Sequence, residues 1–162
     1  MRANMIESVR QNHSLEHATI ALLVQKLGGH VRLAGRSTAN GFYVYGDVPT
    51  DKLEESAHEA LERLRSGQSD LAISAFCGTN LVVSGLMAAT ASMVALGGRN
   101  RWQRLPNAVL AAVSALVLAQ PLGRLAQKYI TTTPDTTGLR IVKVSRNGFG
   151  PFKSHKVETA RG

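Results

Sequence analysis

Two long segments without a charged residue constrain this chain more than any other feature of its sequence. Residues 81–98 hold 18 uncharged positions and residues 105–123 hold 19, with three arginines in the short stretch between them. Each segment is about as long as a helix that crosses the hydrocarbon core of a bilayer. Gly, Ala, Ser and Thr are abundant in both, which suits two helices packed closely in lipid. We therefore predict a transmembrane helical hairpin; a buried hairpin in a soluble protein is the alternative.

Charge is divided unevenly between the two halves of the chain. Residues 1–80 carry eight Lys and Arg against nine Asp and Glu, whereas residues 81–162 carry eleven against two, which gives the net charge of +8. Basic residues beside apolar segments are typical of a membrane surface. An aromatic-rich basic face of the kind that binds nucleic acid is not evident. We expect membrane lipid, and no nucleic acid, as a partner.

The remaining sequence alternates between patterns typical of helices and of strands. Apolar residues and histidines recur at steps of three and four in residues 3–27, which predicts a helix that buries Ile6, Val9, His13, His17, Ile20, Val24 and Leu27. Gly28 and Gly29 then end this helix. Further elements are expected as strands at 30–37 and 41–48, a helix at 49–67, and strands at 71–76 and 139–146. The residues after 146 read as a mobile basic tail.

These elements predict an α+β fold. A helix–strand–strand–helix–strand domain would contain an inserted transmembrane hairpin and continue to a C-terminal strand, which could rejoin the sheet. The expected boundaries are 1–80 for an α/β metal-site domain, 81–128 for the two-helix hairpin, and 129–162 for the C-terminal strand and basic tail. The N-terminus lacks the apolar segment of a signal peptide, which favours a cytoplasmic position for the soluble domain.

The stretch NHSLEH contains the residues that point to chemistry. His13 and His17 are four positions apart, so a helix projects both from one face, and Glu16 lies between them. Two such histidines can hold zinc, and the neighbouring carboxylate can act as the general base for a zinc-bound water. The alternative is a pair of histidines that pack against the core and bond to backbone carbonyls, with Glu16 in solvent.

A longer stretch resembles the catalytic half-domain of the insulysin and pitrilysin type of zinc peptidase. The inverted HxxEH motif is followed by Gly28-Gly29, by two strands with small polar residues and tyrosines, by Val48-Pro49 and by an amphipathic helix, over about residues 12–65. The resemblance implies that His13 and His17 bind zinc and that Glu16 is catalytic. It also implies a peptide, or a segment of a membrane protein, as substrate.

The third metal ligand departs from that peptidase pattern. The peptidases use a downstream glutamate, but this chain has no acidic residue between Asp70 and Asp135. Cys77, the single cysteine, is the best replacement, because a thiolate is a strong zinc ligand. It could equally be a small buried apolar residue. The substrate-enclosing second half of the peptidases is also missing, and a homodimer or the bilayer surface could complete a cleft.

The whole chain also resembles an uncharacterised family of small bacterial membrane proteins, in which NHSLEHATI, GFYVYGDV and CGTN precede two apolar helices. That resemblance implies a multi-pass protein of the bacterial inner membrane. Three function hypotheses follow. The first is a small membrane-anchored zinc hydrolase, a metallopeptidase in particular; the second is a non-catalytic membrane module whose histidines are structural or bind metal only. The third is a basic protein that binds nucleic acid or lipid headgroups through its C-terminal half, and it predicts strongly salt-dependent binding.

Overall fold

The computed structural model describes residues 4–29, 31–98, 100–149 and 152–162. The described residues form two compact units, one from residues 1–74 together with 128–162, and the other from residues 75–127. The first unit contains helices α1 (Met5–Lys26) and α2 (Thr50–Arg65) and four strands. The strands are β1 (Ala34–Thr38), β2 (Gly41–Tyr45), β3 (Leu139–Phe149) and β4 (Phe152–Arg161).

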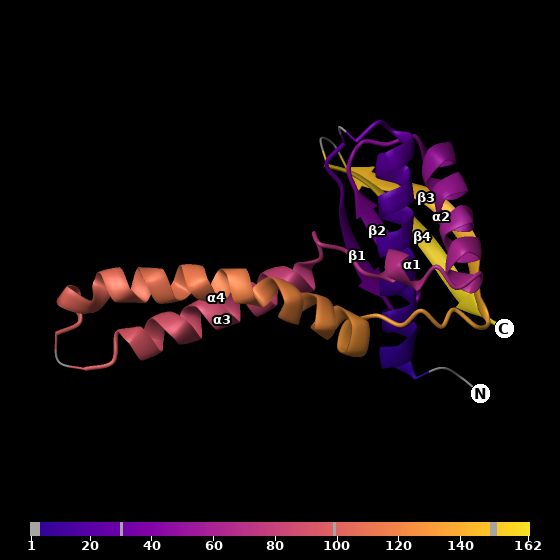
Figure 1. Cartoon of the computed structure of the whole chain (residues 1–162). Helices are drawn as coiled ribbons and strands as arrows, with labels where there is room; N and C mark the ends of the chain where they lie inside the picture. The colour runs from indigo at the N-terminus through magenta and orange to yellow at the C-terminus, as the bar shows by residue number, and fades with distance from the viewer. Residues whose placement is uncertain (1–3, 30, 99, 150–151) are drawn as a thin grey trace. The chain divides into compact units, whose positions relative to one another are not determined.

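The four strands form one antiparallel sheet in the order β1-β2-β4-β3. In Figure 1, α1 and α2 lie side by side across one face of this sheet. The core between the helices and the sheet consists of fully buried apolar side chains, chiefly Leu15, Leu23, Phe42, Val44, Leu53, Leu139 and Val157. The predicted α+β class is confirmed, and so is the first helix–strand–strand–helix order.

The strand predicted at residues 71–76 does not form. Ser69–Ala72 make a short 3-10 helix, and the following residues up to Cys77 form neither helix nor strand. The apolar residues of this segment contribute to the core without forming a strand, since Ala72 is buried and Leu71 packs against the core. The sheet position beside β2 is taken by β4 instead.

The C-terminal segment predicted to be a mobile basic tail is an internal strand of the sheet. Strand β4 pairs with β2 on one side and with β3 on the other. Its alternate residues His155, Val157 and Thr159 are buried beneath the helices. This period-two pattern is that of a strand, but two of its three inward residues are polar types, so hydrophobicity alone does not reveal it.

The buried face of α1 also differs from the predicted stripe. Of the seven residues expected to face inward, only His17 is buried, and Ile6 is 65% exposed. The face that packs on the sheet instead carries polar residues with specific partners. The Thr159 hydroxyl donates to Asn12 Oδ1 (2.8 Å), and Arg161 Nε donates to Gln11 Oε1 (2.8 Å). These hydrogen bonds make burial of the polar residues favourable.

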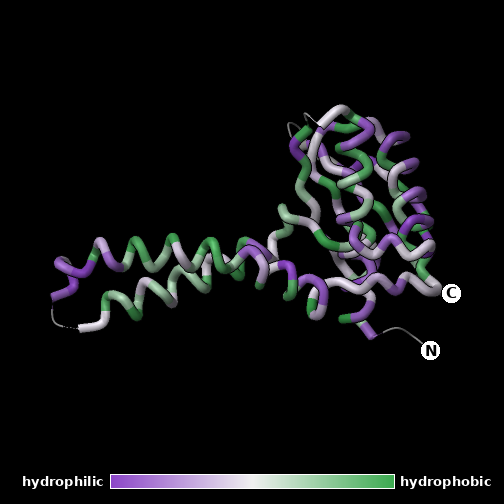
Figure 2. The backbone as a smooth tube through the Cα atoms, in the orientation of Figure 1, coloured by the Kyte–Doolittle hydropathy of each residue, from purple (hydrophilic) through white to green (hydrophobic). Residues whose placement is uncertain are grey.

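The second unit is a pair of helices, α3 (Gly78–Ala95) and α4 (Leu105–Ala126). Small residues of α4 form its buried stripe: Ala108, Ala115, Ala119 and Gly123. Larger apolar side chains, such as Leu86 and Val117, are 68% and 67% exposed. Figure 2 shows the apolar character of both helices along their length. Two helical segments, Gly78–Ala95 and Trp102–Thr131, are long and apolar enough to cross a membrane.

The hairpin begins with a polar network around Cys77 and Asn80. Cys77 is the N-cap of α3, and its Sγ accepts from the Thr79 N–H at 3.4 Å. Asn80 donates to the Ala75 carbonyl (2.9 Å) and accepts from Gln127 Nε2 (2.8 Å). The Asn80 side chain therefore joins the start of α3 to the end of α4.

His155 is a buried histidine through which we expect the stability of the first unit to depend on pH. Burial lowers the pKa of His155, the nearby Arg146 lowers it further, and Asp47 acts in the opposite direction. Nε2 lies 3.1 Å from the Thr50 hydroxyl, and Nδ1 has no hydrogen-bond partner among the described residues.

We expect acid to destabilise the fold through His155. Between its ordinary value of 6.5 and the lowered pKa, the unfolded chain binds a proton that the folded chain does not, so stability falls with falling pH. The limiting slope for one proton is about 1.4 kcal/mol per pH unit. Thermal unfolding of the full chain between pH 7.5 and 5 measures this loss. The His155→Gln variant should lack this part of the loss of stability with falling pH. If its stability changes with pH as steeply as that of the wild type, His155 is not the cause.

Candidate metal centre

Helix α1 places His13, Glu16 and His17 within about one turn. The helix starts with Asn4, whose side chain accepts from the Ile6 N–H, and continues without interruption to Lys26. The two imidazole rings lie with their centroids 4.3 Å apart and their planes tilted by 60°. His17 and Glu16 are each only 5% exposed, whereas His13 is partly exposed. The i, i+4 spacing thus brings the two rings together, as predicted.

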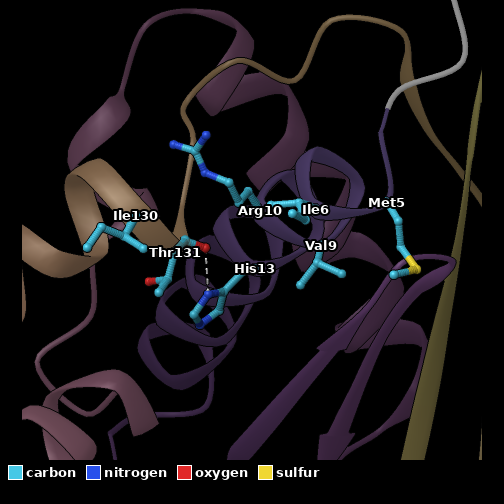
Figure 3. A pocket seen from close by; sticks show the side chains of 7 residues that line it. All are labelled: Met5, Ile6, Val9, Arg10, His13, Ile130 and Thr131. Carbon is cyan, nitrogen blue, oxygen red and sulfur yellow. Dashed lines mark hydrogen bonds between the residues drawn. The ribbon is translucent and has the colours of Figure 1, made fainter.

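Each histidine is oriented by a main-chain carbonyl. His13 Nδ1 lies 2.9 Å from the Thr131 oxygen, shown as the dashed line in Figure 3, and His17 Nδ1 lies 2.8 Å from the Ala72 oxygen. A carbonyl oxygen only accepts, so both rings carry their proton on Nδ1 when neutral. The lone pair is then on Nε2 in both rings. Metal-binding histidines in proteins are typically oriented in this way by a second hydrogen bond.

The two carbonyls belong to the chain segments that precede and follow the helical hairpin. Ala72 lies shortly before residue 75, where the second unit begins, and Thr131 lies shortly after residue 127, where it ends. Further α1 residues hold the second of these segments. Arg10 donates to the Thr132 carbonyl (2.9 Å), and the Ser14 hydroxyl accepts from the Thr133 N–H (2.9 Å). The histidines therefore also attach both of these segments to α1.

Glu16 is held against strand β1. The Ser37 hydroxyl donates a hydrogen bond to Glu16 Oε2. A buried carboxylate needs such partners, because removing it from water without them is costly. Gly35 lies next to Oε1, and a Cβ built on this glycine would stand 2.0 Å from that oxygen. The alternative prediction of a solvated Glu16 is wrong, since the side chain is buried.

The close approach of Gly35 gives a prediction for the Gly35→Ala variant. Its methyl group must displace the buried Glu16 carboxylate, so we expect a loss of about 1–3 kcal/mol in stability, as in other overpacked sites. Thermal unfolding of the purified chain measures this loss. Gly85→Ala is the control, because nothing lies within 4 Å of a Cβ at that position. Equal stability of Gly35→Ala and the wild type would show that Glu16 moves aside freely.

Cys77 lies at the first turn of α3, in the second unit. It lies five positions after Ala72, whose carbonyl is bonded to His17. The partial positive charge at a helix N-terminus also favours a thiolate.

Several residues that build the site carry no sequence signal. The carbonyls of Ala72 and Thr131 act through the main chain, and Ser37 is one of several small polar residues in its strand. Glu55 and His58, a Glu-x-x-His pair on α2, are both exposed. Glu55 forms salt bridges with Lys26 and Lys52. His30 lies outside the described residues.

Sequence comparison places the chain among proteins without an assigned activity. An uncharacterised protein from Picosynechococcus sp. (strain PCC 7002) is 36% identical over 140 residues. The match covers 76% of this chain but 65% of the relative, so the chain spans less than two thirds of that protein's length. No solved structure matches the chain. The likeness to zinc peptidases consequently rests on the motif residues alone. A family model matches residues 8–144, and the chain belongs to that family, described as a domain of unknown function (DUF6391).

Proposed function

We propose that this chain is a membrane-anchored zinc hydrolase that cleaves peptide bonds. His13, His17 and Cys77 would hold the metal, and Glu16 would be the general base. The observation that carries the proposal is the pair of histidine–carbonyl bonds, which places both Nε2 lone pairs on neighbouring rings beside a buried carboxylate. The likeness of residues 12–65 to zinc peptidases supports the reaction class.

The available donors fit zinc. Each of the three residues offers one ligand atom, a histidine nitrogen or the cysteine sulfur. Sets of this kind occur in catalytic zinc sites, where three protein ligands leave one position for water. Magnesium and calcium are disfavoured, because both prefer oxygen ligands. The position of Cys77 at a helix N-terminus, where the partial positive charge favours a thiolate, supports it as the third ligand.

The roles of the chain's own groups follow from their hydrogen bonds. When bound by these ligands, zinc would supply an acidified water and polarise the substrate carbonyl. Glu16 would accept a proton from that water and return it to the leaving amine. Ser37 donates to Oε2, which orients the carboxylate. The carbonyls of Ala72 and Thr131 hold the imidazoles in the ligating tautomer.

The cellular setting is part of the proposal. Two apolar helical segments support a multi-pass protein of the bacterial inner membrane, and the antiparallel hairpin returns the chain to the side from which it entered. The first unit would then lie on one side, which we take to be the cytoplasm. A substrate at the membrane surface, such as a segment of a membrane protein, fits this position. A homodimer could complete the cleft.

Metal analysis of the purified chain tests the proposal. We expect about one zinc ion per chain after purification in detergent without chelator, as for a three-ligand catalytic site. The His58→Gln variant is the control, because His58 is exposed and should not affect the metal. Failure to bind zinc, even after zinc is supplied, would overturn the proposed function.

A second candidate function is a non-catalytic membrane module, and one observation favours it. The bonds from His13 and His17 already attach the two segments that border the hairpin to α1, which is sufficient reason for both histidines to be present. This candidate predicts that the chain keeps its stability when zinc is removed. A metal-dependent hydrolase predicts loss of activity on chelation and recovery on addition of zinc.

A further inference from the structure

A pocket of about 360 Å³ lies beside His13 at the start of α1. Its wall is formed by Met5, Ile6, Val9, Arg10, His13, Ile130 and Thr131, as shown in Figure 3. Met5, Ile6 and Ile130 are 72%, 65% and 68% exposed. Large apolar side chains gathered at an open pocket of this kind indicate a surface that is covered by an apolar partner.

The position of the pocket along the chain identifies the partner. Ile130 and Thr131 are the last residues of Trp102–Thr131, the longer of the two segments able to span a membrane. Lys128 and Tyr129 precede them, both exposed, with the ammonium group 5.5 Å from the centre of the tyrosine ring. Tyrosine and lysine at the end of an apolar span are typical of the bilayer surface. The pocket wall therefore includes residues at the level of the lipid headgroups.

Arg10 gives the pocket a cationic rim. Its guanidinium group donates to Glu7 (3.2 Å) and to the carbonyl of Thr132 (2.9 Å), which hold it in place beside the pocket. Lys128, which is exposed and lies two positions before Ile130, adds a second positive charge in the same unit. An apolar cavity beside positive charge matches an anionic phospholipid, which has acyl chains and a phosphate.

We propose that this pocket binds one acyl chain of an anionic phospholipid of the bilayer, with the lipid phosphate near Arg10. The first turns of α1 then lie at the membrane surface, and the bound lipid covers Met5, Ile6 and Ile130. The assignment depends on the pocket and on its continuity with the apolar segment. It does not depend on metal or on catalysis, but it places the His13 face of α1 next to lipid.

Photochemical labelling tests this assignment. The full chain is placed in nanodiscs of phosphatidylcholine and phosphatidylglycerol that contain a trace of phosphatidylglycerol with a diazirine in one acyl chain. After irradiation and digestion with trypsin, we expect lipid adducts on the peptides 3–10 and 129–140, in addition to the hairpin peptide 105–124. The last peptide confirms that labelling works.

Two variants separate a bound lipid from general contact with the membrane. Val9→Asp and Ile130→Asp each place a charge in the pocket wall and should lower the adducts on residues 3–10 at least fivefold. Ala21→Asp, at an exposed position of the same helix, should leave them unchanged. Circular dichroism shows whether each variant is folded. Adducts confined to residues 105–124, or equal labelling of residues 3–10 in all variants, would overturn the proposal. The pocket would then bind a peptide or a second copy of the chain instead of a lipid.

Discussion

Replacing Glu16 with glutamine is expected to leave the metal bound and to lower hydrolysis by about 10²- to 10⁴-fold, the usual contribution of a general base. The amide has the size of the carboxylate and can still accept a hydrogen bond from Ser37, so the fold should be kept. It cannot accept the proton of a water molecule. The measurement uses the full chain in liposomes with a peptide library, in which new termini are counted by mass spectrometry.

The controls for this experiment come from the same chain. Glu62→Gln changes an exposed carboxylate of α2 and should leave the rate unaltered. Ser37→Ala keeps the base but removes the hydroxyl that orients it, so a smaller loss is expected than in Glu16→Gln. Equal turnover by Glu16→Gln and the wild type would refute the proposed role of Glu16. Absence of turnover in the wild type would favour the non-catalytic function.

The His17→Ala variant is expected to lose zinc and also to lose stability. Its imidazole donates to the Ala72 carbonyl in a buried position, and removing a buried hydrogen-bond partner costs about 1–3 kcal/mol. Cys77→Ala should also lose zinc, and in the zinc-free chain it removes the long Sγ contact with the Thr79 N–H that caps α3. Metal content and thermal unfolding of the zinc-free proteins measure the two effects.

A conservative variant distinguishes the two roles of His17. Glutamine at position 17 can donate to the Ala72 carbonyl but is a poor zinc ligand, so His17→Gln should keep more stability than His17→Ala while still losing zinc. Retention of zinc in Cys77→Ala, with loss in His17→Ala, would direct the search to another third ligand. Retention in both would leave the histidine pair as a purely structural connection.

The elements with a strong periodic pattern were predictable from sequence. Helix α2 repeats its apolar residues at helical spacing, β1 and β2 lie on either side of a short polar turn, and the two uncharged segments form α3 and α4. The proximity of His13 and His17 was equally predictable, because a separation of four residues places them on one helix face. In each of these cases the signal is local.

The predictions for the C-terminal segment and for the buried face of α1 are wrong because residues distant in the sequence decide the structure there. Strand β4 has a period-two pattern, but its inward residues include His155 and Thr159, whose burial depends on Thr50 and Asn12. The polar residues on the buried face of α1, Gln11 and Asn12, have partners equally distant in the sequence. A hydrophobicity pattern does not predict the burial of a polar residue whose hydrogen-bond partner lies more than a hundred positions away in the chain.

The sequence by itself determined the helical hairpin, the α+β class and the spacing of the two histidines, because each depends on residues within a few positions of one another. Only the tertiary structure decided which nitrogen of each histidine carries the proton, since the carbonyls of Ala72 and Thr131 that determine it lie 55 and 118 positions away in the chain. The same holds for the burial of Glu16 against Ser37, 21 positions away. Hydrogen bonds to backbone carbonyls place no demand on residue type, so they leave no pattern in the sequence.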